Sequence, residues 1–266
     1  MNIRQLIFYS LALIFLLFLN SCATISVTKS PSLPSSISPT PIGPIVRTDT
    51  FHIVAPGETL WRISKMYDVP MDDIIKANNL GGQILEKGQR LLIPNAAPPV
   101  PVIPLYPSNR WKYIIIHHSA TDEGSSLDFD KYHQAKGWEE IGYHFVIDNG
   151  SKGKQDGLIE VSPRWVKQKI GSHCKASNMN EKAIGICLVG NFNKEYVSKK
   201  QLDSLIYLVN LLRKYYHIPI YRILGHGQVK GARTDCPGKN FPWLKFKNLL
   251  IKKYNLQDHL ILKTVN

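Results

Sequence analysis

Apolar residues gather in four short runs between residues 113 and 224, and this pattern predicts a sheet. The first of them, Tyr113-Ile114-Ile115-Ile116, has no polar position and fits a buried central strand. Each run is followed by polar or glycine-containing sequence that fits a turn or loop. The predicted strands are residues 113–116, 143–147, 183–190 and 221–224.

Two helical patterns follow the third and fourth runs. Ser198 with Gln201 forms a capping box, which marks the start of a helix, and an apolar stripe follows at helical spacing. Pro242 can begin a last helix, since proline suits the first helical position. Strands alternating with helices predict an α/β layer domain over residues 111–254, followed by a tail at 255–266. The apolar stripe of the helix that begins at Ser198 consists of Leu202, Leu205, Val209 and Leu212.

A smaller segment, residues 51–95, shows a different order of elements. It opens with a short strand at 52–54, and Thr59 can cap a helix with apolar residues at Leu60, Ile63 and Met66. A second helix follows Pro70, and a closing strand is predicted at 91–93. The segment is therefore predicted to be a β-α-α-β module.

Proline-rich stretches lie on both sides of this module. Residues 22–50 and 96–110 have many prolines and no apolar period. Such composition is typical of extended tethers, so we predict two linkers that separate the module from its neighbours.

The first residues have the pattern of a signal peptide. Arg4 precedes an uncharged apolar run that is shorter than the ~20 residues of a spanning helix. The string Leu19-Asn20-Ser21-Cys22 resembles a bacterial lipobox, which implies a signal peptide over 1–21 and lipid on Cys22. Cleavage of another kind and an uncleaved membrane anchor stay open as alternatives. All three place the rest of the chain outside the cytoplasm, and we expect an exported protein, lipid-anchored to a bacterial membrane and facing the cell wall.

Charge and cysteine content narrow the picture further. Lys and Arg number 33 against 20 Asp and Glu, a formal charge of +13, which favours anionic surroundings such as nucleic acid, membrane or cell wall. No sequence motif supports nucleic acid, so we expect no nucleic-acid partner. If Cys22 carries lipid, three cysteines remain, and an odd number argues against a simple disulfide framework. A Cys174–Cys187 disulfide stays open.

Two histidines and a cysteine suggest a metal site. His117 and His226 each follow a predicted strand, and Cys236 lies ten positions after His226 in a polar, glycine-containing loop. Two imidazoles and one thiolate suit Zn²⁺ and leave a fourth position open, which marks a catalytic site rather than a structural one.

The small module resembles LysM modules over its whole length. The resemblance rests on "HIVAPGETLWRISKMYDV", "IIKANNL" and "LEKGQRLLIP". LysM modules bind N-acetylglucosamine-containing glycans between the first turn and the later loop. The resemblance therefore implies that Gly57, Glu58, Thr59, Ile84 and Leu85 lie near the sugar.

The larger domain resembles the zinc amidases of the peptidoglycan-recognition-protein and short phage amidase family, from residue 111 to about 245. The motifs occur in the family order: "YIIIHHSAT", "GWEEIGYHFVIDNG", "GSHCKASN", "AIGICLVGNF" and "GHGQVKGARTDCPG". The resemblance implies a mixed β-sheet flanked by helices. It also implies zinc ligands at His117, His226 and Cys236, catalytic roles for Tyr143 and Thr234, and a stem-peptide contact at His173.

These observations predict an N-acetylmuramoyl-L-alanine amidase that cleaves the bond to the stem peptide with a zinc-bound water. Its expected partner is peptidoglycan, both glycan and stem peptide, and we expect a monomer. The alternative is a lipoprotein that recognises peptidoglycan without cutting it. An amidase that recycles released muropeptides is a further alternative, but export and a glycan-binding module favour the polymer.

Overall fold

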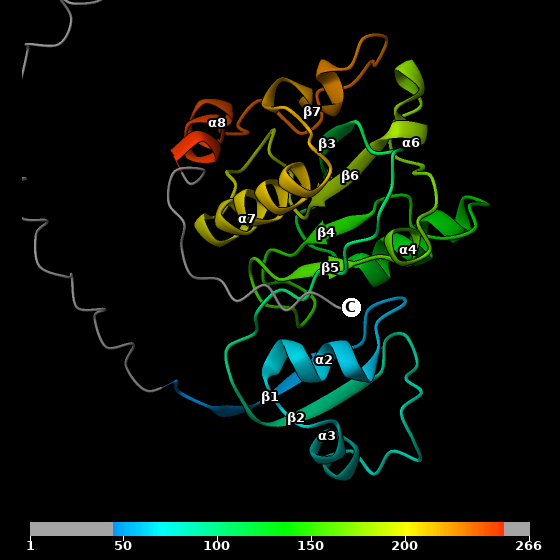
Figure 1. Cartoon of the computed structure of the whole chain (residues 1–266), viewed down its shortest axis with the longest axis vertical. Helices are drawn as coiled ribbons and strands as arrows, with labels where there is room; N and C mark the ends of the chain where they lie inside the picture. The colour runs from blue at the N-terminus through cyan, green and yellow to red at the C-terminus, as the bar shows by residue number, and fades with distance from the viewer. Residues whose placement is uncertain (1–44, 253–266) are drawn as a thin grey trace, which may run out of the picture. The chain divides into compact units, whose positions relative to one another are not determined.

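The computed structural model describes residues 45–252. Within this range, no helix combines the length and the hydrophobicity that crossing a membrane requires. The predicted signal peptide, Cys22, most of the first tether and the tail at 255–266 lie outside the described residues. The remaining segments form a small module and a larger α/β domain (Figure 1).

The small module has the predicted β-α-α-β order. Strand β1 (Thr48–Ile53) pairs antiparallel with β2 (Arg90–Ala96), and helices α2 (Leu60–Tyr67) and α3 (Met71–Ala77) lie between them in sequence. The Thr59 side chain accepts a hydrogen bond from the Arg62 amide at 3.2 Å, so it caps α2 as expected. The core consists of apolar residues from α2, α3 and β2, including Leu60, Ile63, Ile74, Leu91 and Ile93, together with Val54 directly after β1.

The larger domain is built on a five-stranded mixed sheet in the order β5-β4-β6-β3-β7 (Figure 1). Its strands are β3 (Tyr113–His118), β4 (Phe145–Ile147), β5 (Ile159–Val161), β6 (Ala183–Leu188) and β7 (Ile223–Gly225). All neighbours are parallel except β4 and β5. The predicted fold class is therefore confirmed.

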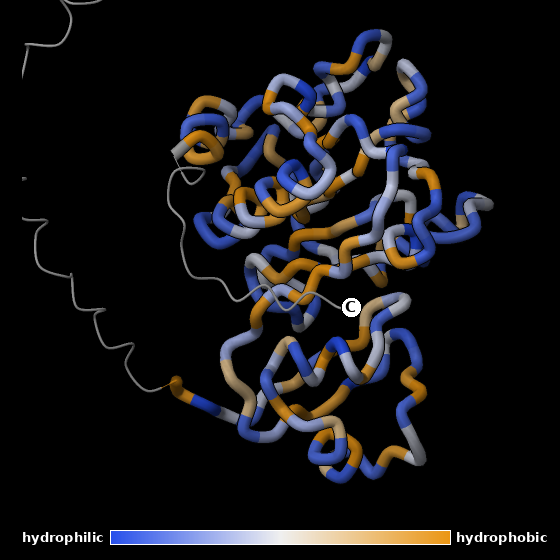
Figure 2. The backbone as a smooth tube through the Cα atoms, viewed as in Figure 1, coloured by the Kyte–Doolittle hydropathy of each residue, from blue (hydrophilic) through white to orange (hydrophobic). Residues whose placement is uncertain are grey.

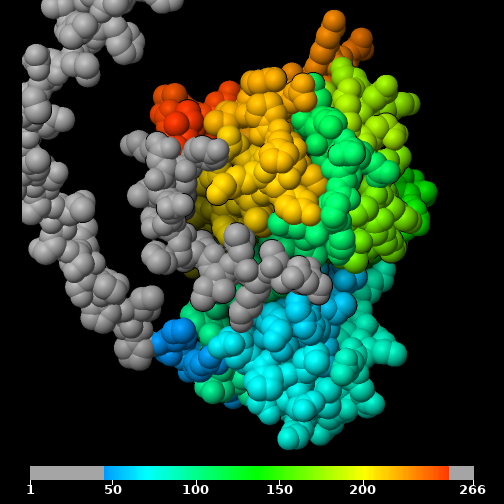
Figure 3. All heavy atoms as spheres, in the orientation of Figure 1, coloured from blue at the N-terminus to red at the C-terminus, as the bar shows by residue number. Residues whose placement is uncertain are grey.

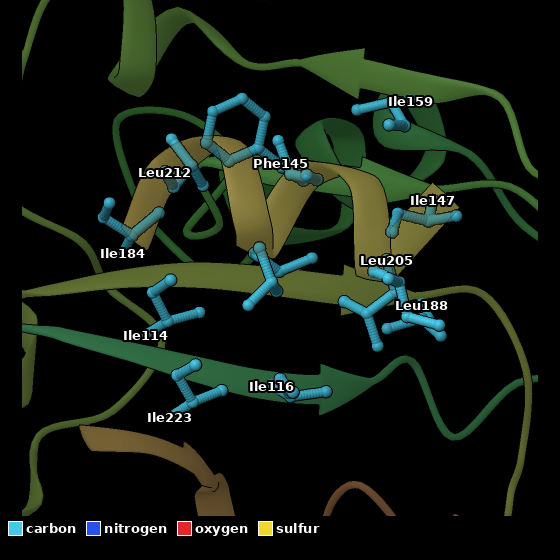
Figure 4. Close-up of a cluster of buried hydrophobic side chains, with 14 of the residues drawn as sticks. Ile114, Ile116, Phe145, Ile147, Ile159, Ile184, Leu188, Leu205, Leu212 and Ile223 are labelled. Carbon is cyan, nitrogen blue, oxygen red and sulfur yellow. The ribbon is translucent and has the colours of Figure 1, made fainter. Parts of the chain in front are cut away.

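One face of this sheet forms the main core under α7 (Lys199–Tyr215). The capping box of Ser198 and Gln201 begins this helix as predicted. Its apolar stripe packs on alternate strand residues, which Figure 4 shows pointing towards the helix. In Figure 2 the strands of this sheet carry long orange stretches, which mark hydrophobic residues. Helix α8 (Trp243–Lys252) lies beside α7. The strand residues that pack under α7 are Ile114, Ile116, Phe145, Ile147, Ile184, Ile186 and Leu188.

The opposite face carries His117 and Cys187 among apolar residues such as Ile115 and Val146. It is covered by α4 (Ser126–Ala135) and by the segment that contains η1 (Ala176–Asn178) and α6 (Met179–Lys182). His117 and Cys187 are partners in the β3–β6 register, so their side chains lie on this face, next to each other. Residues 114, 116 and 118 lie on the other face, which is the alternation expected for His117 and His118.

Several predicted strands differ at their ends in the structure. Strand β4 begins at Phe145, so Tyr143 and His144 precede it. The run at 221–224 begins in a single turn, η2 (Ile220–Arg222), because the Arg222 amide bonds back to the Pro219 carbonyl at 2.9 Å. Helix α4, strand β5, the short α5 (Pro163–Val166) and the turn η3 (His226–Gln228) were not predicted.

Residues 97–110 differ from the extended tether that their prolines predict. Val102 and Ile103 are buried. The Pro104 carbonyl accepts a hydrogen bond from Trp165 Nε1 at 2.7 Å, and Val102 joins the core of the small module together with Leu158. Proline removes a donor from the backbone but keeps the carbonyl and the ring, so such a segment can still pack.

Candidate metal centre and its surroundings

Three side chains that the sequence singled out lie together at one edge of the sheet. His117 lies near the end of β3, and His226 directly follows the neighbouring parallel strand β7. A nitrogen of each and the sulfur of Cys236 all lie within 4.8 Å of one another. Cys236 Sγ is 3.6 Å from His117 Nδ1, and the two imidazole centroids are 4.8 Å apart. The group is therefore compact enough to hold one metal ion.

Backbone contacts bring Cys236 to the histidines. The Gly227 amide donates to the Cys236 carbonyl at 2.7 Å, which closes the loop between the second and third residues of the group. A Cβ at Gly227 would lie 2.3 Å from the Thr234 carbonyl oxygen, so only glycine allows this approach. The His118 amide points at Cys236 Sγ from 3.4 Å. Figure 3 shows the loop, in orange, projecting from the surface.

The donor set fits a soft dication. Burial, together with His173 and His226, lowers the pKa of His117 well below 6.5, so its imidazole is neutral and can act as a ligand. Burial raises the pKa of Cys236 to about 12, so its thiol needs a nearby positive charge in order to ionise. Neutral imidazoles and one thiolate are the ligands that zinc prefers, and binding would release the thiol proton.

Tyr143 lies beside this group. Its ring centroid is 5.2 Å from that of His117, and the Ser162 hydroxyl donates to its backbone carbonyl at 2.7 Å. Burial raises the pKa of Tyr143 well above 10, and the neighbouring Cys187 raises it further. The phenol therefore keeps its proton and is a hydrogen-bond donor at neutral pH.

The other two predicted residues of this site have different surroundings. Thr234 is exposed on the loop, and its Oγ1 accepts from the Cys236 amide at 3.2 Å, which leaves the hydroxyl proton free to donate. His173 is buried, with Nδ1 3.0 Å from His117 Nε2. It also borders a cavity of about 700 Å³ together with Trp138, Lys169 and Cys174. A contact of His173 with a stem peptide stays a prediction.

His118 and His144 accept hydrogen bonds from backbone amides, and the described cysteines form no disulfide. His118 Nδ1 accepts from the Phe192 amide at 3.1 Å on the far face of β3. His144 Nδ1 accepts from the Gly185 amide at 2.9 Å. Within the described residues Cys174, Cys187 and Cys236 are all free, so the Cys174–Cys187 disulfide that the sequence left open is not formed.

Residues predicted to lie near a sugar in the small module divide into two groups. Gly57 and Thr59 are exposed, Ile84 is 94% exposed, and Leu85 is half-buried against the module core. The Glu58 carboxylate is instead buried and bonded to His52 Nε2 at 2.8 Å and to Arg62 at 3.1 Å. Contact of Glu58 with a sugar would therefore have to come from its backbone.

Two neighbours of Tyr143 were missed as site residues. Cys187 was considered as a possible disulfide partner of Cys174, and Ser162 was not considered. The register of β3 with β6 places Cys187 beside His117, but a sequence does not show register between strands that are far apart. Ser162 precedes Pro163, a common helix-start signal that marks α5 but gives no indication of Tyr143.

Comparison with known proteins agrees with both resemblances. Residues 107–239 match the N-acetylmuramoyl-L-alanine amidase family, and residues 52–94 match the LysM domain. Peptidoglycan-recognition protein LB of Drosophila melanogaster is 36% identical over 137 residues, which are 47% of this chain and 54% of that protein. The chain thus spans about half the length of that relative.

A phage enzyme and a bacterial structure are also similar. The endolysin of Escherichia phage T7 is 32% identical over 38% of this chain and 67% of its own length. The solved amidase LysC of Clostridium intestinale is 32% identical, with a TM-score of 0.45, over 59% of this chain and 99% of that one. The family match covers half of the 266 residues. The chain therefore belongs to the N-acetylmuramoyl-L-alanine amidase family and carries a LysM domain ahead of its amidase domain.

Proposed function

We propose that the chain is a peptidoglycan hydrolase that cleaves the amide bond between N-acetylmuramic acid and L-alanine, with Zn²⁺ held by His117, His226 and Cys236. The observation that carries the proposal is the compact His-His-Cys group with the Tyr143 ring beside it. Family membership and the similarity to phage endolysins support a hydrolase of peptidoglycan. The LysM domain supports binding of the same polymer.

The residues around the group suit amide hydrolysis. Zinc at such a site supplies Lewis acidity that activates water and polarises a carbonyl. Tyr143 offers a protonated hydroxyl to the oxygen on which negative charge develops. Thr234 can donate to the same oxygen, since its Oγ1 already accepts from Cys236 and its proton is free. The His118 amide donates to the sulfur of Cys236 and favours its thiolate form.

Mass spectrometry of digested peptidoglycan tests the proposal. Purified protein should release stem peptides with a free L-alanine amino end and leave glycan with free muramic-acid carboxyl ends. A chelator should abolish the release, and added Zn²⁺ should restore it. New reducing sugar ends would identify a glycosidase instead. Binding to the wall without any new ends would identify a recognition protein.

Export with a lipid anchor is a separate proposal, supported by the Leu19 to Cys22 string. In a bacterial host, the Cys22→Ser chain should leave the membrane fraction or remain unprocessed, because the thiol that takes the lipid is lost. Incorporation of a fatty-acid analogue measures this directly. Label that persists in Cys22→Ser would contradict the anchor.

A further inference from the structure

His173 is not one of the three candidate metal ligands, but its ring is hydrogen-bonded directly to the ring of one of them, His117. Its Nδ1 lies 3.0 Å from His117 Nε2, and its Nε2 lies 3.2 Å from the Ala183 carbonyl oxygen. We infer that His173 is a positioning residue that holds the His117 ring with Nδ1 facing the metal. The inference rests on the proposed zinc site and concerns a role that is distinct from contact with substrate.

The hydrogen-bond chain allows one arrangement of protons. A carbonyl oxygen can only accept, so His173 Nε2 carries the proton on that side. A neutral imidazole carries one proton, so with that proton on Nε2 the Nδ1 atom of His173 is an acceptor. His117 Nε2 must then donate to it, which leaves His117 Nδ1 without a proton. That nitrogen is the one 3.6 Å from Cys236 Sγ.

The same arrangement is required for metal binding. A histidine ligates through its unprotonated nitrogen, and the partner of its other nitrogen decides which one that is. Ala183, at the start of β6, therefore sets the tautomer of His117 through His173. The two rings meet nearly edge to face, with centroids 5.0 Å apart and planes at 79°.

The fold builds a slot for the His173 ring. A Cβ on Gly171 or on Gly185 would lie 2.4 Å from His173 Cδ2, so both positions leave the space that the ring fills. The backbone is fixed as well, since the Asn180 side chain accepts from the His173 amide at 2.8 Å and from the Cys174 amide at 2.7 Å. A surface residue whose only role is to contact substrate would not need a space shaped to its ring and a fixed backbone.

Burial distinguishes this role from a place on the cleft wall. His173 is 8% exposed, and both ring nitrogens already have protein partners. A stem peptide could reach only an edge of the ring. The polar atoms that would recognise a peptide are engaged with His117 and Ala183.

A matched pair of variants tests the inference. His173→Asn places an oxygen where Nδ1 lies and can still accept from His117, whereas His173→Leu has a similar branched shape but no acceptor. The measurement is the dissociation constant for Zn²⁺, from competition with a chromogenic chelator, on the full chain. We expect the Leu variant to bind Zn²⁺ about 10–100-fold more weakly than wild type, and the Asn variant to stay close to wild type.

A second variant fills the space beside Gly185 that the His173 ring occupies and leaves His173 itself unchanged. Gly185→Ala should displace the ring and weaken Zn²⁺ binding, while urea unfolding of the metal-free chain reports whether the fold survives. His217→Gln, at an exposed histidine without a role in the site, is the control that should change neither quantity.

The outcomes separate this inference from the proposed function. Wild-type zinc affinity in His173→Leu would overturn the positioning role and leave the zinc site standing. An unchanged zinc affinity with a raised KM for peptidoglycan would return His173 to a substrate contact. A wild-type chain that binds no Zn²⁺ would overturn both.

Discussion

At the scale of single residues, Cys236 distinguishes a metal site from a cluster of buried polar groups. Removing its sulfur leaves two imidazoles, which hold zinc weakly. We expect Cys236→Ala to lose bound zinc and all cleavage of peptidoglycan, measured as metal per chain and as released stem peptides. Cys174→Ala, which removes a free buried thiol outside the group, should keep both. Full zinc content in Cys236→Ala would rule out the sulfur as a ligand.

Substitution of Tyr143 tests the catalytic step rather than metal binding. In Tyr143→Phe the ring can keep its contact with His117 and only the hydroxyl is lost. Turnover should fall by roughly 10²–10⁴-fold, the usual loss when one proton-transfer or oxyanion-stabilising group is removed. Zinc content and wall binding should not change.

A nearby tyrosine provides the matched control for this substitution. Tyr132 is 59% exposed on α4, and Tyr132→Phe should turn over at the wild-type rate. Cleavage by Tyr143→Phe at the wild-type rate would make Tyr143 a packing residue and leave Thr234 as the candidate donor.

At the scale of elements, the features that were predicted correctly from the sequence are those that depend on residues close together in the chain. Thr59 and Ser198 cap their helices as expected, because a cap depends on residues three positions away. Strand β5 has only three residues and exists through its pairing with β4, so no local pattern predicts it. The burial of Glu58 was also missed. Its partner His52 lies on β1, and the sequence pattern of that strand does not show that a charged pair is buried there.

The buried Glu58 network gives a prediction for the small module. Burial would raise the pKa of Glu58, but the charges of His52 and Arg62 outweigh it and hold the pKa far below 4.5. Glu58→Gln leaves Arg62 buried without its counter-charge, and we expect a loss of about 3 kcal/mol in module stability. Hydrogen exchange of the α2 amides in the full chain measures it.

The same shift fixes the pH dependence of the module. A carboxyl whose folded pKa is depressed contributes stability that is complete above its unfolded value near 4.5 and declines as the pH falls below it. Protection of α2 should therefore decline below pH 4.5 in wild type more steeply than in Glu58→Gln. The control Asp203→Asn breaks the exposed pair with Lys199 and should cost at most about 0.5 kcal/mol. Equal acid sensitivity of wild type and Glu58→Gln would contradict the network's role.

At the scale of the whole chain, the module and the amidase domain are joined by more than a flexible spacer. Val102 and Leu158 complete the core of the small module, and Lys154 Nζ donates to the Ile53 carbonyl at 2.7 Å. Deleting the module would expose these residues and disturb the catalytic domain. A test of what the module contributes must therefore change its surface and leave its core intact.

Ile84 offers that change. It is a large aliphatic side chain, 94% exposed, on the loop that the LysM resemblance places near the sugar. A second binding site in one chain raises the effective concentration of the catalytic site on a polymer but does nothing for a small substrate. Ile84→Ser should therefore weaken binding to insoluble wall by roughly tenfold, from the loss of about 1.5 kcal/mol of apolar burial. Cleavage of a soluble muropeptide should keep the wild-type rate.

The control is Leu244→Ser, which removes a comparably exposed side chain, 77% exposed, from α8 of the amidase domain. It should alter neither wall binding nor turnover, because α8 lies outside both sites. Sedimentation with purified wall measures binding, and release of L-alanine-ended peptides measures turnover. If Ile84→Ser slows cleavage of polymer and muropeptide equally, the loop acts on the catalytic site itself. If it changes neither, the glycan binds elsewhere on the module.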